Sequence, residues 1–168
     1  MTIVYIGLGS NLGQPKSQLR DALVAIDNLP NSKLLRHSSF YGSTPMGPQD
    51  QPDFYNAAAL INTTLPPRDV MAWLLSTEQA MGRTRLRRWG ERCIDLDLLL
   101  YDELSLENDD LVIPHPRILD RDFVLLPLLD LNPELSHPFW APKTLKSALS
   151  GLQQKFVEND PEPWELTD

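Results

Sequence analysis

Two aspartates separated by one residue are the strongest candidates for chemistry in this sequence. Asp95 and Asp97 lie in Ile94–Leu99, an otherwise apolar run that is typical of a buried strand. Because side chains alternate across a strand, both carboxylates would share one face, with their Cα atoms roughly 6.5–7 Å apart. Carboxylates suit Mg²⁺, which takes its remaining ligands from water and substrate phosphates. The pair therefore predicts a cation site, and an ordinary acidic strand face in solvent is the alternative.

An arginine-rich segment comes directly before the two aspartates. It holds Arg83, Arg85, Arg87, Arg88 and Arg92, with only Glu91 as an acid. Guanidinium groups match the geometry of phosphate oxygens, so this segment next to a carboxylate pair predicts a site for a metal-bound polyphosphate. The alternative is a solvated loop, whose exposed ion pairs contribute little stability. Trp89 lies among these charges, where its ring could stack on an arginine or on a planar ligand.

Other features are weaker candidates. Gly7–Gly13 lacks the spacing of a dinucleotide fingerprint and the Lys-Ser/Thr of a Walker loop, so any ATP site would lack a P-loop; a tight strand-to-helix connection is the alternative. A long loop over 42–52, rich in Gly and Pro, is of a kind that often carries function. Asn56 follows it near Phe54, and its amide offers a donor and an acceptor to the edge of a ring. His115, between two prolines, is a candidate phosphate contact.

The pattern of apolar residues predicts the elements that would position these groups. Strands are expected over 4–9, 34–41, 54–63 and 93–101, and helices over 19–29 and 66–81. This β-α-β-β-α-β order is the ferredoxin-like pattern of an α+β fold. After residue 102 we expect an irregular extension with one amphipathic helix within 145–156. Residues 158–168 carry five acids and no base, which predicts a solvated, mobile tail.

Composition narrows the class of protein. With 168 residues, one domain over 1–168 is the default, and a single cysteine excludes an internal disulfide. The 15 basic and 23 acidic side chains give a net charge of −8, which argues against a nucleic-acid binder. No apolar run approaches the roughly 20 residues that span a bilayer, and no basic stretch marks an export signal. We therefore expect a cytoplasmic domain without nucleic-acid or membrane partners.

Four separated segments, in order along the chain, resemble one family of enzymes. They are Gly9–Gly13, Tyr41–Ala57, Arg88–Leu99 and Val112–His115. The family that they resemble is 6-hydroxymethyl-dihydropterin pyrophosphokinase, of folate biosynthesis, and the likeness extends over nearly the whole chain. It implies a ferredoxin-like fold and transfer of a pyrophosphoryl group from ATP to the hydroxymethyl group of the pterin, with release of AMP.

The resemblance also implies roles for individual residues. Asp95 and Asp97 would hold two Mg²⁺ ions that bridge the ATP phosphates, a common arrangement in phosphoryl-type transfer. The implied catalytic set is Arg83, Arg92, Asp95 and Asp97. Further contacts to ATP are expected from Glu78, Arg85, Arg88, Arg92, Ile113, His115 and Arg121. The pterin would lie between Trp89 and Phe123, and its edge and rim contacts would come from Ser43, Thr44, Met46, Phe54 and Asn56.

Two other classes of function stay open from the residues alone. One is a metal-dependent phosphodiesterase or nuclease that uses Asp95 and Asp97, and the other is a non-catalytic, nucleotide-sensing ferredoxin-like module. A nuclease would usually have a broader basic surface, whereas the chain outside 83–92 carries −12 once the +4 of that segment is taken from the total of −8. A sensor needs neither an aromatic pocket nor catalytic arginines. We therefore expect a monomeric, Mg-ATP-dependent diphosphotransferase with small-molecule substrates.

Overall fold

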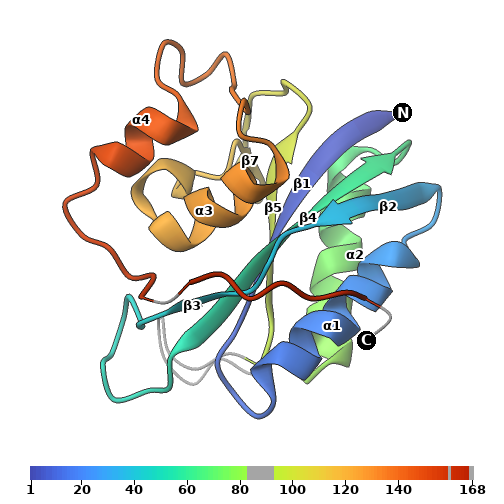
Figure 1. The fold of residues 1–168 in the computed structure, drawn as a ribbon. Coiled ribbons are helices and arrows are strands. Elements are labelled where there is room, and N and C mark those ends of the chain that lie inside the picture. Colours follow the sequence, from blue (N-terminus) through green and yellow to red (C-terminus); the bar gives the residue numbers. More distant parts are fainter. Residues whose placement is uncertain (83–92, 159, 167–168) are drawn as a thin grey trace.

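An antiparallel sheet forms the centre of the computed structural model, which describes residues 1–82, 93–158 and 160–166 (Figure 1). Its strands are β1 (Thr2–Ser10), β2 (Ser32–His37), β3 (Tyr41–Ser43), β4 (Phe54–Thr63) and β5 (Asp95–Tyr101). They lie in the order β2-β4-β1-β5, and β3 pairs with β4 beyond the end of β2. Together with the helices that connect the strands, this order confirms the predicted ferredoxin-like α+β fold.

Two helices, α1 (Pro15–Asp27) and α2 (Pro67–Ala80), lie together on one face of the sheet (Figure 1). Each begins at a proline, where the missing N–H group costs no helical hydrogen bond. Their apolar stripes pack against the sheet in one core, which includes Leu19, Leu23, Ile26, Val70, Leu74, Ile6, Ile61 and Leu96. Both helices were predicted from this spacing, and the structure confirms them.

The opposite face of the sheet is covered in part by α3 (Asp122–Leu131) and α4 (Leu145–Ser150) (Figure 1). A second core lies between these helices and the sheet and includes Tyr5, Ala58, Leu99, Leu125, Leu128, Leu131, Leu145 and Ala148. Between β5 and α3 the chain forms a small hairpin, β6 (Leu106–Glu107) with β7 (Val112–Ile113), and a 3₁₀ turn at Ile118–Asp120. The start of α3 borders the part of this face that the helices leave open.

The strand expected over 34–41 is wrong as a single element, because it is divided into β2 and β3. Ser38 causes the division. Its hydroxyl oxygen accepts a hydrogen bond from the N–H of Ala58 at 2.8 Å, in place of a backbone carbonyl. Its own carbonyl accepts from the indole Nε1–H of Trp164 at 2.8 Å. The ladder with β4 is therefore interrupted and resumes at Tyr41.

The extension after residue 102 contains one helix that was not predicted, α3, and the helix that was predicted, α4, is shorter than expected. Helix α3 was not predicted, because Pro127 lies inside it and proline usually excludes a helix interior. The predicted helix within 145–156 ends at Ser150, and Gly151 caps it. Phe156 is buried all the same, in an extended segment beside β3. No helix within the described ranges combines the length and the apolar character needed to cross a membrane.

Most side chains of the C-terminal segment 160–166 are exposed, as expected of a solvated tail, but its backbone and one side chain pack against the domain. Glu162 forms an antiparallel bridge with Phe40, with an N–H···O distance of 2.9 Å in each direction. Trp164 is 6% exposed and stacks on the Phe40 ring, with centroids 4.4 Å apart and 8° between the planes. The acids of the tail face solvent while its backbone and its tryptophan pack against the domain, and charge composition alone does not reveal this difference.

Candidate functional site

Two rows of residues cross three neighbouring strands and form the floor of a pocket. In the order β4, β1, β5, the rows are Asn56, Gly9 and Asp95, and Ala58, Gly7 and Asp97. Because the middle residue of each row is glycine, no side chain stands between the side chains of β4 and the two carboxylates. A Cβ atom at Gly9 would lie 3.4 Å from the Asn56 Oδ1 atom. The bare backbone of β1 therefore leaves a flat surface on which a planar ligand could lie.

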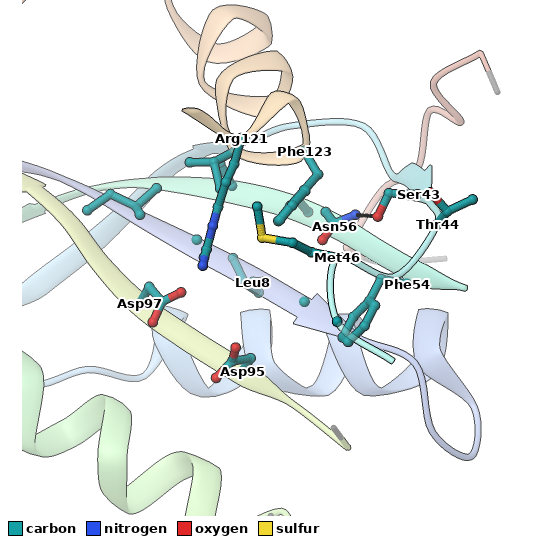
Figure 2. A pocket seen from close by; sticks show the side chains of 17 residues that line it. Leu8, Ser43, Thr44, Met46, Phe54, Asn56, Asp95, Asp97, Arg121 and Phe123 are labelled. Atoms are coloured by element: carbon teal, nitrogen blue, oxygen red, sulfur yellow. Dashed lines mark hydrogen bonds between the residues drawn. The ribbon is translucent and has the colours of Figure 1, made fainter. Parts of the chain in front are cut away.

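The walls of the pocket are charged at one end and aromatic at the other (Figure 2). Asp95 and Asp97 stand on β5, on the pocket side of the strand. The other end is lined by Ser43, Thr44, Met46, Gly47, Phe54, Phe123 and Val124. These residues come from β3, the loop after it, the start of β4 and the start of α3. The pocket thus joins a site for cations and anions to a site for an apolar ring.

Asn56 is held in one orientation at the aromatic end of the floor. Its Nδ2 group donates to the carbonyl oxygen of Tyr41 at 2.9 Å and to the Ser43 hydroxyl oxygen at 2.8 Å. Both amide hydrogens are therefore used within the protein, and Oδ1 is directed toward the floor at Gly9. Since Asn56 is only 6% exposed, a ligand here would meet a preoriented hydrogen-bond acceptor.

Arg121 brings a positive charge to the carboxylate end of the pocket. It directly precedes α3, and its side chain extends toward Asp97 (Figure 2). Burial lowers the pKa of its guanidinium, as does Arg117, while Asp97 and Asp95 act in the opposite direction. An arginine stays protonated in proteins all the same. Its Nε atom is buried and has no hydrogen-bond partner within the described part of the chain. An anionic oxygen at this position would supply one.

His115 lies beside the charged end without lining the pocket. Its Nδ1 atom accepts a hydrogen bond from the backbone N–H of Arg117 at 3.2 Å, and the backbone N–H of His115 donates to the carbonyl oxygen of Leu99 at 3.0 Å. Burial lowers the pKa of the imidazole, and Arg121 lowers it further, while Asp95 acts against both. The lowered pKa favours the neutral ring, and because Nδ1 accepts from Arg117, the proton of that form lies on Nε2.

The pocket brings together nine of the residues expected from the sequence: Ser43, Thr44, Met46, Phe54, Asn56, Asp95, Asp97, Arg121 and Phe123. The predicted common face of Asp95 and Asp97 is confirmed. Glu78 and Ile113 do not line it. The Oε2 atom of Glu78 accepts from the N–H of Leu96 at 2.8 Å, and Ile113 is buried in the core. The predictions for five further residues concern positions outside the described residues: Arg83, Arg85, Arg88, Trp89 and Arg92.

The glycines of the floor are the functional positions that sequence reasoning missed. Gly7 and Gly9 lie within β1, in the strand expected over 4–9, but no part in the site was expected for them. Their spacing of two matches the spacing of Asp95 and Asp97 on the neighbouring strand. This shared spacing is visible in the sequence, but only the register between β1 and β5 shows that each glycine pairs with one of the aspartates. The fold and site together define a ferredoxin-like α+β protein with paired carboxylates beside an aromatic pocket.

Comparisons with known proteins identify the family. Residues 5–133 match the family model described as 7,8-dihydro-6-hydroxymethylpterin-pyrophosphokinase. A relative from Haemophilus influenzae named 2-amino-4-hydroxy-6-hydroxymethyldihydropteridine pyrophosphokinase is 49% identical over 138 residues, which cover 82% of this chain and 86% of that protein. A relative of the same name from Pseudomonas aeruginosa is 45% identical, covering 80% and 83%. The chain belongs to this pyrophosphokinase family.

Solved structures support the fold. A Plasmodium falciparum HPPK-DHPS structure with SDX-DHP matches with a TM-score of 0.67 at 15% identity. The match covers 89% of this chain and 43% of that one, so the chain spans less than half of the solved protein. Nothing in the comparisons supports the nuclease or the nucleotide-sensing alternative.

Proposed function

We propose that this chain transfers the pyrophosphoryl group of ATP to the hydroxymethyl group of 6-hydroxymethyl-7,8-dihydropterin, in folate biosynthesis. Membership of the pyrophosphokinase family supports the reaction. The observation at the site that carries the proposal is that one pocket has a charged end and an aromatic end. A flat ring with a hydroxymethyl arm fits the aromatic end, and the arm would then point toward the carboxylates.

The aromatic end supports a bicyclic, nitrogen-containing ring as the acceptor substrate. Phe54 and Phe123 both line this end (Figure 2), and aromatic faces stack well on planar rings. The Oδ1 atom of Asn56 accepts hydrogen bonds, which matches the N–H groups at the edge of a pterin. Ring stacking would thus set the plane of the substrate, and Asn56 would set its rotation within that plane.

The charged end supports binding of Mg²⁺ with the ATP phosphates. Asp95 and Asp97 offer hard oxygen ligands at adjacent positions of one strand face, and Mg²⁺ in proteins often uses one or two carboxylates and completes its shell with water and phosphate oxygens. When bound, Mg²⁺ would neutralise negative charge on the polyphosphate. We propose two such ions, following the family resemblance. The buried Nε atom of Arg121 would donate to a phosphate oxygen.

The reaction then consists mainly of positioning two substrates. The hydroxymethyl oxygen loses its proton to solvent and forms a bond to the β-phosphorus of ATP, while the bond from that phosphorus to the oxygen of AMP breaks and AMP leaves. Holding the pterin on Asn56 and the phosphates near Arg121 would align these atoms, which is how phosphoryl-type transfers are generally accelerated. The catalytic roles of Arg83 and Arg92, the ATP contacts of Arg85, Arg88, Ile113, His115 and Glu78, and the pterin contact of Trp89 stay predictions.

The test is to incubate the protein with Mg-ATP and 6-hydroxymethyl-7,8-dihydropterin and to separate the products by chromatography. We expect AMP and the pterin diphosphate in equal amounts, and neither without the pterin. Formation of ADP, or no reaction, would contradict the proposal. We also propose a cytoplasmic monomer consisting of one domain over 1–168, for which light scattering after size exclusion measures the mass against 19.1 kDa.

A further inference from the structure

The C-terminal residues 156–158 extend the sheet beside β3, next to the aromatic end of the pocket. The N–H of Thr44 donates to the carbonyl oxygen of Phe156 at 2.9 Å, and the N–H of Glu158 donates to that of Gly42 at 3.3 Å. Ser43 and Val157 form the antiparallel bridge between these bonds. Because Ser43 and Thr44 line the pocket, this segment supports one of its walls from behind.

A buried carboxylate fastens the same segment to the opposite wall. Asp122 is 2% exposed, and its Oδ2 atom accepts from the N–H groups of Phe156 and Val157, both at 2.9 Å. These two bonds satisfy Oδ2, as a buried polar oxygen requires, whereas the buried Oδ1 atom has no hydrogen-bond partner within the described part of the chain. Asp122 stands between Arg121 and Phe123 in the chain, and both of these line the pocket.

The ring of Phe156 completes the connection. It meets the ring of Phe123 edge to face, with centroids 5.8 Å apart and 81° between the planes. Phe156 is 5% exposed, so its ring has little room to move away. The segment therefore contacts Phe123 through a side chain and Thr44 through the backbone, and Asp122 holds the backbone between them.

We infer that Asp122 is a positioning residue for the pterin, which acts by clamping residues 156–157 between the two walls of the aromatic end. The inference rests on the proposed function of this pocket. Asp122 does not itself line the pocket, so its effect is indirect. Without the clamp, the walls at Phe123 and Thr44 lose a common support. The carboxylates on β5 are unaffected, because the pairing of β5 with β1 holds them. Loss of Asp122 should therefore affect the pterin far more than ATP.

The experiment compares Asp122→Ala with Asp122→Asn and with a control, Asp130→Ala. Asp130 lies on the same helix and also accepts a backbone N–H, that of Ser39 at 2.8 Å, but it does not line the pocket. KM for each substrate and kcat are measured from AMP formation. For Asp122→Ala we expect KM for the pterin to rise roughly tenfold with KM for ATP within about twofold. Asp122→Asn should restore part of the loss, because its amide oxygen can still accept both N–H groups while its Nδ2 group takes the buried position of Oδ1, which has no partner within the described residues.

The outcomes separate this inference from the proposed function. If the wild-type protein forms no AMP, the proposed function fails and the inference falls with it. If the wild-type protein is active and Asp122→Ala leaves KM for the pterin unchanged, or raises both KM values equally, only the clamp is wrong. Should Asp122→Ala not fold, Phe156→Leu removes the edge contact with Phe123 and keeps the carboxylate. We expect a severalfold rise in KM for the pterin from this variant, and an unchanged value would overturn the inference.

Discussion

Asn56 and Asp95 face the same ligand space from opposite sides of Gly9. Each is positioned by a local rule: the hydrogen bonds from Nδ2 of Asn56 direct its Oδ1 atom into the pocket, and strand alternation places Asp95 beside Asp97 on one face. The glycine between them contributes by having no side chain. At the residue scale, the site thus consists of one oriented hydrogen-bond acceptor, two carboxylates and a glycine that leaves room for a ligand.

Replacing Asp97 by alanine should nearly abolish turnover, with a loss of at least roughly a hundredfold in kcat, because metal-held ATP is needed for the chemistry. Binding of the pterin should stay detectable, since the aromatic end is unchanged. Steady-state AMP formation and quenching of pterin fluorescence measure the two effects, with Asp130→Ala as the control. Near-normal turnover of Asp97→Ala would show that this carboxylate does not have the proposed role.

Adding a side chain at Gly9 should block the floor of the pocket in proportion to its size. A Cβ atom there lies at ordinary contact distance, 3.4 Å, from Oδ1 of Asn56, so Gly9→Ala should be mild. The branched side chain of Gly9→Val projects farther over the floor, and we expect KM for the pterin to rise roughly tenfold or more. Kinetics and thermal unfolding of both variants distinguish a blocked site from a damaged strand. Equal kinetics for the two variants would mean that no ligand lies on this floor.

At the scale of elements, the C-terminal segment holds the region between β2 and β3. Trp164 stacks on Phe40, and its indole N–H occupies the carbonyl of Ser38, where the ladder with β4 is interrupted. The same chain segment, a few residues earlier, carries Phe156 beside the pocket. The C-terminal segment therefore supports the sheet at two places, of which only the one at Trp164 lies in the part that was expected to be solvated.

Replacing Trp164 by alanine should lower the free energy of unfolding by about 3 kcal/mol, because a large buried ring is lost and its stacking on Phe40 with it. Phe139 serves as the matched control, since its ring is 67% exposed and its truncation should change stability by no more than about 0.5 kcal/mol. Urea unfolding followed by circular dichroism measures both. Similar stability of the two variants would contradict the packing seen at Phe40.

Elements with a regular apolar period were predictable, and those that depend on a particular contact were not. Helices α1 and α2 follow from spacing and proline position alone. The division between β2 and β3 depends on Ser38 and its partners Ala58 and Trp164, which are distant in the sequence. Helix α3 contains Pro127, and burial of its apolar residues against the sheet compensates the lost hydrogen bond. Secondary structure predicted from local sequence is therefore wrong where tertiary packing outweighs the intrinsic preference of the residues.

At the scale of the whole molecule, the pocket lies over the part of the sheet that α3 and α4 leave uncovered. Helices α1 and α2 fill one face of the sheet, whereas α3 and α4 cover the other only in part (Figure 1). The total charge of −8 opposes the approach of a polyphosphate at long range. Binding of such a ligand must therefore depend on local positive charge, such as that of Arg121 at the end of the pocket.

The sequence alone determined the β-α-β-β-α-β order of the core elements and the common face of Asp95 and Asp97, because both depend on periods within one segment of chain. It also held the family resemblance, which the comparisons confirm. Only the tertiary structure decided what faces the carboxylates, because Asn56 and Gly9 reach them through the register between strands. The clamp at Asp122 and the burial of Trp164 likewise depend on contacts between distant segments, since a side chain's spacing in the chain says nothing about which backbone groups it will meet.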